Sequence, residues 1–413
     1  MRLLQLCKKF PYPLKDGESI AVMNLSRALH DQGCEVSLLA MNTSKHFCDV
    51  SSVNGSFKHF KAAYYTELDN TLNAKDAFLN LFSKESYHIS RFICPDFTKQ
   101  LITMLKENTY DIIQLETLYM APYVPIIRKF SKAMVAMRAH NVEHEIWSRV
   151  AQNTSPFIKK MYLKYLTNKL RKYEIKQLNN YDLMIAISQK DLDTFRTLGF
   201  KNSGLVTPIG LDSSLYKPDN RSYKKEISLS FIGSLDWMPN LEGLKWFLDN
   251  VWDQLLAKYP NLKLHVAGRN TPVTLINARY KNVKVYGEVN DAKKFINSHT
   301  VMIVPLLSGS GMRAKILEGM ALGKVVLTTQ LGLEGINAIH KEHVLVADTA
   351  NQFVEALDYC YRSNGSLSTL GKNAQELVVK EYDNVETAKN LIEEYKKFVK
   401  KESVIDKKMA FAS

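Results

Sequence analysis

One stretch of the sequence places small residues, two cations and a single acid at spacings that suit the binding of an anion. It reads GSGMRAKILEGMALGK, from Gly309 to Lys324, and follows an apolar run that predicts a β-strand. Small residues let backbone N–H groups approach an anion closely, and the N-terminus of a helix carries a partial positive charge. Arg313 and Lys315 add formal charge near the start of the predicted helix. This combination predicts a site for a phosphate or diphosphate group.

A lone carboxylate, Glu318, lies inside the same predicted helix, which we place at 312–322. Apolar side chains cover one half of this helix and flank Glu318 on the other, so the helix is expected to be buried on all sides. A buried carboxylate must be paired or hydrogen-bonded. One interpretation is a structural ion pair with Lys315. The interpretation that we favour is that Glu318 accepts hydrogen bonds from two vicinal sugar hydroxyls, such as those of a nucleotide ribose.

Strand-like and helix-like segments alternate along nearly the whole chain, which is the pattern of parallel α/β sheets. The expected strands of the first half are 2–7, 35–41, 111–116, 133–140, 183–188 and 204–210, and the region 43–94 reads as irregular. Those of the second half are 227–233, 263–268, 283–289, 301–307, 324–329 and 343–348. We therefore predict two doubly wound domains, 1–210 and 227–383, joined by a polar linker, 211–226, with a last helix near 384–401.

In sheets of this kind, ligands bind beyond the carboxyl ends of the strands, where glycine-containing loops lead into helices. Four loops fit this description: the loop at Gly17, the loop at Gly233, the loop of Gly268 and Arg269, and the stretch that begins at Gly309. The four come from both halves of the chain. We expect them to face one shared cleft.

The composition narrows the classes of protein to which the chain can belong. Its 413 residues are 46% hydrophobic and 23% charged, as in a globular protein of two domains. The five cysteines have no metal-type spacing and favour a reducing compartment. No stretch approaches the roughly 18 apolar residues of a membrane span, and the apolar run at the start is too short for a signal peptide. We expect a cytoplasmic protein.

The chain is also strongly basic, with a net charge of +13. The segment 156–180 alone carries seven lysines and arginines against one glutamate, with an apolar stripe made of Ile158, Tyr162, Leu166 and Leu170. It can be a helix docked on its sheet with a solvated basic face, or a surface that binds anionic lipid at the inner face of the cytoplasmic membrane. The sequence has neither zinc-finger spacing nor an RNP-like aromatic pattern, so we expect no nucleic-acid partner.

The stretch GSGMRAKILEGMALGK, 309–324, resembles the family 4 glycosyltransferases of the GT-B fold, especially the exopolysaccharide-type sugar transferases. The resemblance extends over essentially the whole length of the chain. The other stretches that carry the resemblance are LLQLCKKFPYPLKDGES near the start, RAHNVEHEIW (138–147), FIGSLDWMPNLEGLKWF (231–247) and GLEGI (332–336). The resemblance implies two Rossmann-like domains that face a cleft. The C-terminal domain would hold a nucleotide-sugar donor, and the N-terminal domain, with the last helix packed back on it, would hold the acceptor.

The activity that the resemblance implies is transfer of a hexose-type sugar from a nucleotide diphosphate to a glycan or a polyprenyl-diphosphate-linked saccharide, in the synthesis of surface polysaccharide. It also implies retention of the anomeric configuration. Glu318 matches the family's glutamate that binds the ribose, and His140 matches the histidine that approaches the donor sugar. Gly17 matches the glycine loop near the diphosphate, and Glu334 in its glycine-flanked loop is a further donor-sugar candidate. Taken alone, His140 could equally be a histidine of the core.

The sequence departs from the family pattern at three positions. The family commonly has a glutamate eight positions before the ribose glutamate, where this chain has Ser310, and backbone groups of 310–312, which include Gly311 and Met312, are our candidates to replace its contacts. An arginine and a lysine of the family are here Ser234 and Pro239. A diphosphate leaving group still needs cations. We infer that three basic residues substitute for them: Arg313, Lys315 and Arg269.

We expect neither a metal nor a cofactor, because the one D-x-D element, at 191–193, begins a predicted helix. Two other functions stay open. A nucleotide-sugar epimerase of the same fold would need acid–base carboxylates at the sugar, where Ser310 stands. A non-catalytic module would bind nucleotides or nucleic acid without turnover. A dinucleotide oxidoreductase is disfavoured because no strand precedes a full G-x-G-x-x-G with an acidic residue about 20 positions further on.

Overall fold

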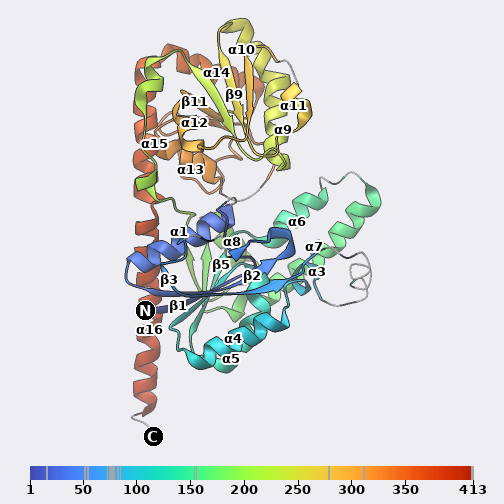
Figure 1. Ribbon diagram of the computed structural model, residues 1–413, viewed down its shortest axis with the longest axis vertical. Helices are drawn as coiled ribbons and strands as arrows, with labels where there is room; N and C mark the ends of the chain where they lie inside the picture. The colour runs from blue at the N-terminus through green and yellow to red at the C-terminus, as the bar shows by residue number, and fades with distance from the viewer. Residues whose placement is uncertain are drawn as a thin grey trace. The chain divides into compact units, whose positions relative to one another are not determined.

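The computed structural model describes residues 1–14, 17–50, 53, 55–71, 73, 80, 83, 85–152, 154, 156–277, 280–309 and 312–410, without the side chains of 364 and 400–410. The chain divides into two compact units. The first unit comprises Met1–Gly210 and Asn384–Ser413, and the second comprises Leu211–Asp383. Each unit is an α/β structure around its own sheet (Figure 1).

In the described part of the first unit, seven parallel strands form a sheet in the order β3-β2-β1-β4-β5-β6-β7. Their bounds are β1 Arg2–Cys7, β2 Glu35–Thr43, β3 Phe60–Leu68, β4 Ile112–Glu116, β5 Met134–Ala139, β6 Leu183–Ala186 and β7 Ser203–Val206. The strand order reverses between β1 and β4, which is where such sheets bind ligands. The sequence did not predict β3, because this edge strand is largely exposed and lacks an apolar run.

Helices cover both faces of this sheet. They are α1 Gly17–Asp31, α3 Tyr87–Ser90, α4 Pro95–Glu107, α5 Val124–Phe130, α6 Glu143–Gln152, α7 Phe157–Gln177, α8 Gln189–Thr197 and α16 Asn384–Ala410. Helices α1 and α16 pack on one face, and α4 and α5 pack on the other (Figure 1). Successive strand residues such as Leu3 and Leu4 therefore enter different cores, which explains why most residues of the central strands are apolar.

In the described part of the second unit, six parallel strands are ordered β10-β9-β8-β11-β12-β13. Their bounds are β8 Ser228–Ile232, β9 Lys263–Ala267, β10 Val283–Gly287, β11 Val301–Val304, β12 Val325–Thr328 and β13 Leu345–Val346. The helices are α9 Met238–Phe247, α10 Asp253–Lys258, α11 Val273–Asn277, α12 Ala292–Asn297, α13 Ala314–Ala321, α14 Ala350–Arg362 and α15 Leu367–Glu381. The order reverses between β8 and β11. The prediction of two doubly wound parallel-sheet domains is confirmed.

The polar segment 211–226, expected from the sequence to be a linker, packs on the second unit. It forms two short 3-10 helices, Ser213–Leu215 and Asn220–Lys224. The hydroxyl of Tyr223 donates to the carbonyl of Gly323 at 2.7 Å, and Nζ of Lys324 donates to Oγ of Ser222 at 2.9 Å. These two bonds tie the segment to the residues between α13 and β12.

Helix α16 returns the chain to the first unit. Its residues Leu391, Ile392 and Tyr395 are part of the core beneath α1. No helix in the described part of the chain combines the length and the apolar composition that a membrane crossing requires.

Candidate functional site

The glycine-rich stretch of the second unit follows β11 and leads into α13. The helix begins at Ala314, so Arg313 is its N-cap residue and not part of its first turn as the sequence predicted. Gly309 has a φ of +106°, which glycine adopts without strain, and a Cβ there would lie 3.2 Å from Nη2 of Arg313. Met312 is buried. Ser310 and Gly311, two of the predicted donor-binding residues, lie outside the described residues.

The loop after β8 meets the first turn of α13 at Lys315. Nζ of Lys315 donates to Oδ1 of Asn240 at 2.6 Å and lies 5.2 Å from the ring centroid of Phe231. A Cβ at Gly233 would lie 3.3 Å from this Nζ and 2.8 Å from Nδ2 of Asn240, so a larger residue there would displace the ends of these two side chains. Burial, together with the nearby Arg313, lowers the pKa of Lys315 to about 7. An anion bound here would stabilise its charged form.

Glu318 is half-buried on α13, and its hydrogen-bond partner comes from the segment 211–226. The hydroxyl of Tyr216 donates to Oε1 of Glu318 at 2.9 Å. The other oxygen, Oε2, has no hydrogen-bond partner in the described residues. Burial raises the pKa of Glu318, although the Tyr216 hydroxyl, Lys293 and Lys315 act against this shift. Tyr216 is itself held by Lys293, whose Nζ lies 4.3 Å from the ring centroid.

The structural ion pair between Glu318 and Lys315, one of the two interpretations of the sequence, does not form in the described part of the chain. The two side chains turn to different partners, Tyr216 and Asn240. The sequence analysis missed both partners. Tyr216 lies in the polar segment that the sequence predicted to be a linker, and Asn240 is one polar residue at the start of α9, so neither gives a local signal.

The other predicted residues of the second unit lie in loops that approach these elements. A Cβ at Gly268 would lie 2.1 Å from the carbonyl oxygen of Gly233, and the carbonyl of Arg269 accepts a hydrogen bond from the backbone of Leu235 at 2.9 Å. The loops after β8 and β9 are therefore in direct contact. Glu334 is half-buried in the loop after β12, one position before Gly335, which has a φ of +82°.

His140 of the first unit follows β5 and is buried against a carboxylate that the sequence analysis missed. Nε2 of His140 lies 2.9 Å from Oε2 of Glu116, the last residue of β4. The same oxygen lies 3.3 Å from Nη1 of Arg138. Burial raises the pKa of Glu116, but Arg138 and the bond with His140 lower it by more, so the net shift is downward. The ionised Glu116 favours a proton on Nε2, which leaves Nδ1 of His140 as an acceptor.

The burial of His140 agrees with its interpretation as a histidine of the core, and its role at the donor sugar stays a prediction. The ring is buried and fixed by the core, and its Nδ1 makes no hydrogen bond with the described residues. An acidic residue at the end of the apolar strand DIIQLE was the signal that could have identified Glu116. Gly17 begins α1, and a Cβ at this position would meet no atom within 4 Å. Packing against the protein therefore does not require glycine there.

No group of three or more histidine, cysteine or acidic side chains suited to a metal ion occurs in the part of the chain that the structure describes. The second unit places an arginine, a lysine and a glutamate, Arg313, Lys315 and Glu318, at the start of α13 beside glycine-containing loops. Such a set can neutralise a diphosphate and accept hydrogen bonds from hydroxyl groups.

Family models match both halves of the chain. The model for Glycosyltransferase Family 4 matches residues 16–214, and the model for Glycosyl transferases group 1 matches residues 226–363. Over 398 residues, the chain is 21% identical to an uncharacterized 44.6 kDa protein in the cps region of Klebsiella pneumoniae. This alignment covers 93% of the chain and 97% of that protein.

Solved structures share the fold over nearly the whole chain. Sucrose-phosphate synthase from Thermosynechococcus elongatus superposes with a TM-score of 0.70 at 16% identity, covering 96% of this chain and 99% of the other. The Anabaena protein HepE in complex with UDP superposes with a TM-score of 0.67 at 15% identity, covering 96% and 100%. HepE in complex with UDP-glucose gives a TM-score of 0.63. At identities this low, these TM-scores show a common fold and nothing more.

Proposed function

This chain belongs to the family 4 glycosyltransferases of the GT-B fold, and we propose that it transfers a hexose from a nucleoside diphosphate sugar to a glycan or a lipid-linked saccharide. The observation that carries the proposal is the half-buried Glu318, with one oxygen held by Tyr216 and the other without a protein partner in the described residues. The UDP and UDP-glucose complexes of HepE support a nucleotide-sugar donor. The relative in a cps region supports a role in surface polysaccharide synthesis.

In the proposed donor site, neighbouring residues of the second unit bind different parts of the donor. Glu318 accepts hydrogen bonds from the ribose hydroxyls through Oε2, while Tyr216 keeps the carboxylate in place. Lys315 and Arg313 hold the diphosphate at the amino end of α13, where backbone N–H groups add to the positive potential. Arg269 and the glycine loops at Gly233 and Gly309 complete the site. Glu334 is proposed to contact the donor sugar.

The chemistry that this site must support is cleavage of the anomeric C–O bond as the diphosphate departs. Negative charge grows on the leaving group, and prepositioned cations and N–H donors stabilise it. Loss of one such donor raises the barrier by about 3–4 kcal/mol, which is the effect we expect for Lys315→Met. We propose that His140 offers Nδ1 to the donor sugar. Retention of configuration and independence from metal ions belong to the same proposal.

The proposal is tested by a thermal-shift screen with UDP-, GDP-, ADP- and TDP-sugars. We expect one nucleotide class to raise the melting temperature of the wild type and to have no such effect on Glu318→Ala. The control is Glu376→Ala, because Glu376 is an exposed acid on α15 of the same unit. If no nucleotide sugar stabilises the wild type, or if Glu318→Ala responds fully, the proposal fails. Formation of an epimer from the donor alone would instead identify an epimerase.

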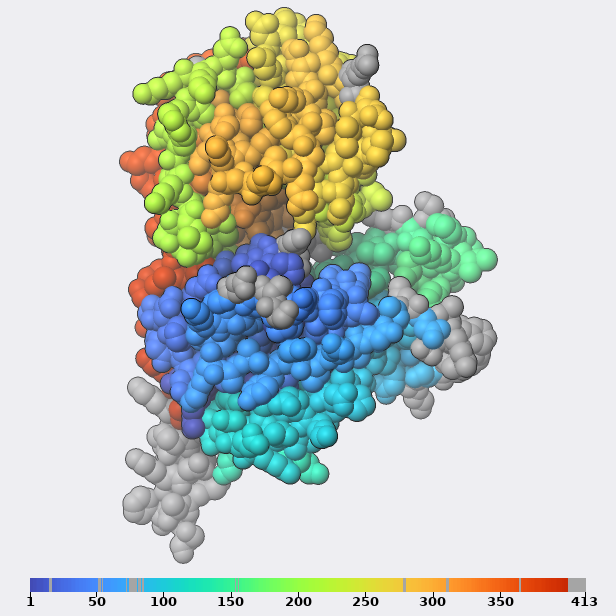
Figure 2. Space-filling model, in the orientation of Figure 1, coloured from blue at the N-terminus to red at the C-terminus, as the bar shows by residue number. Residues whose placement is uncertain are grey.

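We further propose that the first turns of α7 contact an anionic membrane surface. The sequence predicted an apolar stripe along this helix, but only its C-terminal half is buried, with Leu166 and Leu170 in the core. Phe157 and Ile158 are 75% and 84% exposed beside Lys159, and α6 and α7 project from the rest of the unit (Figure 2). Exposed apolar residues with lysines between them suit the interface of a membrane that contains anionic lipids.

A vesicle flotation assay tests this contact. The wild type should float with phosphatidylglycerol vesicles and remain in solution with phosphatidylcholine vesicles, and Ile158→Glu should lose the association. Val379→Glu is the control, because Val379 is an exposed apolar residue on α15, a helix of the second unit. Equal flotation of the wild type with both lipids would refute the contact.

A further inference from the structure

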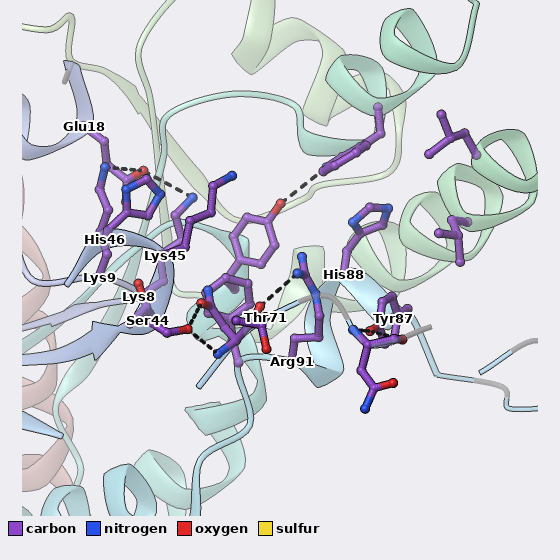
Figure 3. Close-up of a pocket in the computed structure, with 18 of the residues that line it drawn as sticks. Lys8, Lys9, Glu18, Ser44, Lys45, His46, Thr71, Tyr87, His88 and Arg91 are labelled. Carbon is purple, nitrogen blue, oxygen red and sulfur yellow. Dashed lines mark hydrogen bonds and ion pairs between the residues drawn. The ribbon is translucent and has the colours of Figure 1, made fainter. Parts of the chain in front are cut away.

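A large cavity lies within the first unit, and no predicted site residue lines it. Its volume is about 810 Å³, which is within the range of small-molecule binding sites. It is formed where β1 and β2 end, beside α3, α6 and the start of α7. Figure 3 shows Lys8, Lys45, His88 and Arg91 around it. We refer to it as the basic cavity.

His88 lines the basic cavity, and its buried ring lacks hydrogen-bond partners in the described residues. It is 4% exposed, and neither of its ring nitrogens has a hydrogen-bond partner in the described residues. Its ring packs on Trp147 with centroids 4.0 Å apart. Burial, with Arg91 nearby, lowers the pKa of His88 to about 4, so the ring is neutral near pH 7. A neutral imidazole offers one donor and one acceptor, and sugar hydroxyls can satisfy both.

Arg91 places a second unsatisfied group at the same cavity. Its Nε is buried and has no hydrogen-bond partner in the described residues, while Nη1 donates to the carbonyl of Asn70 at 3.3 Å. Oγ1 of Thr43, at the end of β2, is also buried without a partner there. Buried polar groups are rarely left without a partner in proteins. Three side chains at one cavity therefore point to a polar ligand.

The charges around the cavity indicate the sign of that ligand. Among the described residues that line it, five are lysine or arginine and one, Glu18, is acidic. Glu18 already faces Lys8 at 3.2 Å and Lys9 at 3.7 Å. The positive charges of Lys45, Arg91 and the other lining lysine, Lys159, are therefore not balanced by lining carboxylates. Aromatic side chains such as Trp147 and Tyr119 supply apolar surface for the faces of a sugar ring.

We propose that the basic cavity binds the acceptor, and that this acceptor is a saccharide carrying an anionic group, either a carboxylate or a phosphate. The sugar hydroxyls bond to His88, and the anionic group lies against Arg91 and Lys45. The inference rests on the proposed function, because it takes the cavity of the first unit as the acceptor site. It adds the chemical class of the acceptor.

The test uses saturation-transfer NMR on the full chain with three probes: methyl glucuronide, glucose 6-phosphate and methyl glucoside. We expect at least one anionic probe to bind about tenfold more tightly than the neutral glucoside, as when a charge-assisted hydrogen bond replaces a neutral one. Preference for the glucuronide would assign a carboxylate, and preference for the phosphate would assign a phosphate. Equal binding of all three probes by the wild type, or binding of none, would overturn the proposal.

Arg91→Met should abolish the preference for the anionic probe. The control is Arg171→Met, which removes the same charge from an exposed position of α7 that does not line the cavity. If the two variants behave alike, the assignment to Arg91 fails. His88→Phe keeps a ring in the cavity without donors or acceptors and should weaken all three probes, whereas His88→Gln should restore part of the binding.

Binding of the donor nucleotide to the same variants separates this inference from the proposed function. The groups proposed to hold the donor nucleotide lie in the second unit, so UDP or the nucleotide found by the screen should bind Arg91→Met as it binds the wild type. Normal nucleotide binding without discrimination among the saccharide probes would refute only the anionic acceptor. Failure of the wild type to bind any nucleotide would refute the proposed function, whatever the probes do.

Discussion

Helix α13 contains two ionisable side chains with shifted pKa values, Lys315 and Glu318. They are three positions apart in one helix, yet each turns to its own polar partner. Burial lowers the pKa of Lys315 to about 7 and raises the pKa of Glu318. Shifted pKa values of this kind are common at functional sites, where an ionisable side chain is buried beside the position of its ligand. Lys315 is suited to the proposed contact with a diphosphate, and Glu318 to the proposed contact with ribose hydroxyls.

Because the pKa of Lys315 is lowered, we expect nucleotide binding to be coupled to proton uptake. Above about pH 7 the free protein has largely lost this proton, because the pKa of Lys315 is depressed. A bound diphosphate favours the charged ammonium and raises the pKa, so binding near pH 8 should take up a proton. Affinity for UDP, or for the nucleoside diphosphate that binds best, should therefore fall as pH rises from 7.

Isothermal titration in two buffers of different ionisation enthalpy, HEPES and Tris, measures this uptake. The observed binding enthalpies should differ between the buffers for the wild type and agree for Lys315→Met. Identical enthalpies for the wild type would show that Lys315 does not gain a proton from its ligand.

The sequence identifies a candidate site residue when its type is unusual for its position in a predicted element. It does not identify a hydrogen-bond partner that comes from a distant part of the chain. Glu318 was identifiable because an acid stands alone among apolar residues, and Gly309 because glycine precedes a helix. Tyr216 and Asn240 are brought to α13 only by the tertiary fold. The unsatisfied nitrogens of His88 likewise result from packing, and nothing in its local sequence marks them.

At the scale of elements, the ends of β1, β4 and β5 converge on one buried carboxylate. Glu116 accepts a hydrogen bond from Gln5 of β1 at 3.2 Å and faces Arg138 of β5 at 3.3 Å. Gln114 of β4 also bonds to it and is itself bonded by Tyr395 of α16. A helix from the end of the chain is thereby joined to the strands beside His140. The network fixes the position of the histidine through several elements.

We expect Glu116→Gln to destabilise the protein by about 3–5 kcal/mol, because it leaves the buried Arg138 without its counter-charge. Urea denaturation measures the change in the free energy of unfolding. The control is Glu35→Gln, which removes the carboxylate of an exposed ion pair with Lys61 and should have a much smaller effect. Comparable losses for the two variants would contradict the structural role of Glu116.

Elements were predictable where strands are buried on both faces, and less so elsewhere. The strands β1, β4, β5 and β11 are mainly apolar and almost wholly buried, so their positions could be predicted from their composition. Strand β3 is an exposed edge strand and has no such run. The first turns of α7 follow the apolar period of a buried helix but remain exposed, because burial depends on what packs there and not on periodicity.

At the scale of the whole molecule, each unit contributes a different set of groups. The second unit, which is continuous in sequence, contains every side chain proposed to hold the nucleotide. The first unit contains His140, the basic cavity and the exposed start of α7, and it is completed by α16 from the end of the chain. We therefore expect changes at Glu318 to alter nucleotide binding and changes at Arg91 to alter saccharide binding, each without the other.

The most direct test of the account measures whether Glu318 binds the ribose hydroxyls. Titration calorimetry would compare the nucleoside diphosphate that binds best with its 2′,3′-dideoxy form, on the wild type and on Glu318→Ala. The wild type should bind the dideoxy form about 10- to 100-fold more weakly, as expected for lost hydrogen bonds to a carboxylate, and Glu318→Ala should bind the two forms equally. Equal binding by the wild type, or undiminished discrimination by the variant, would contradict the account.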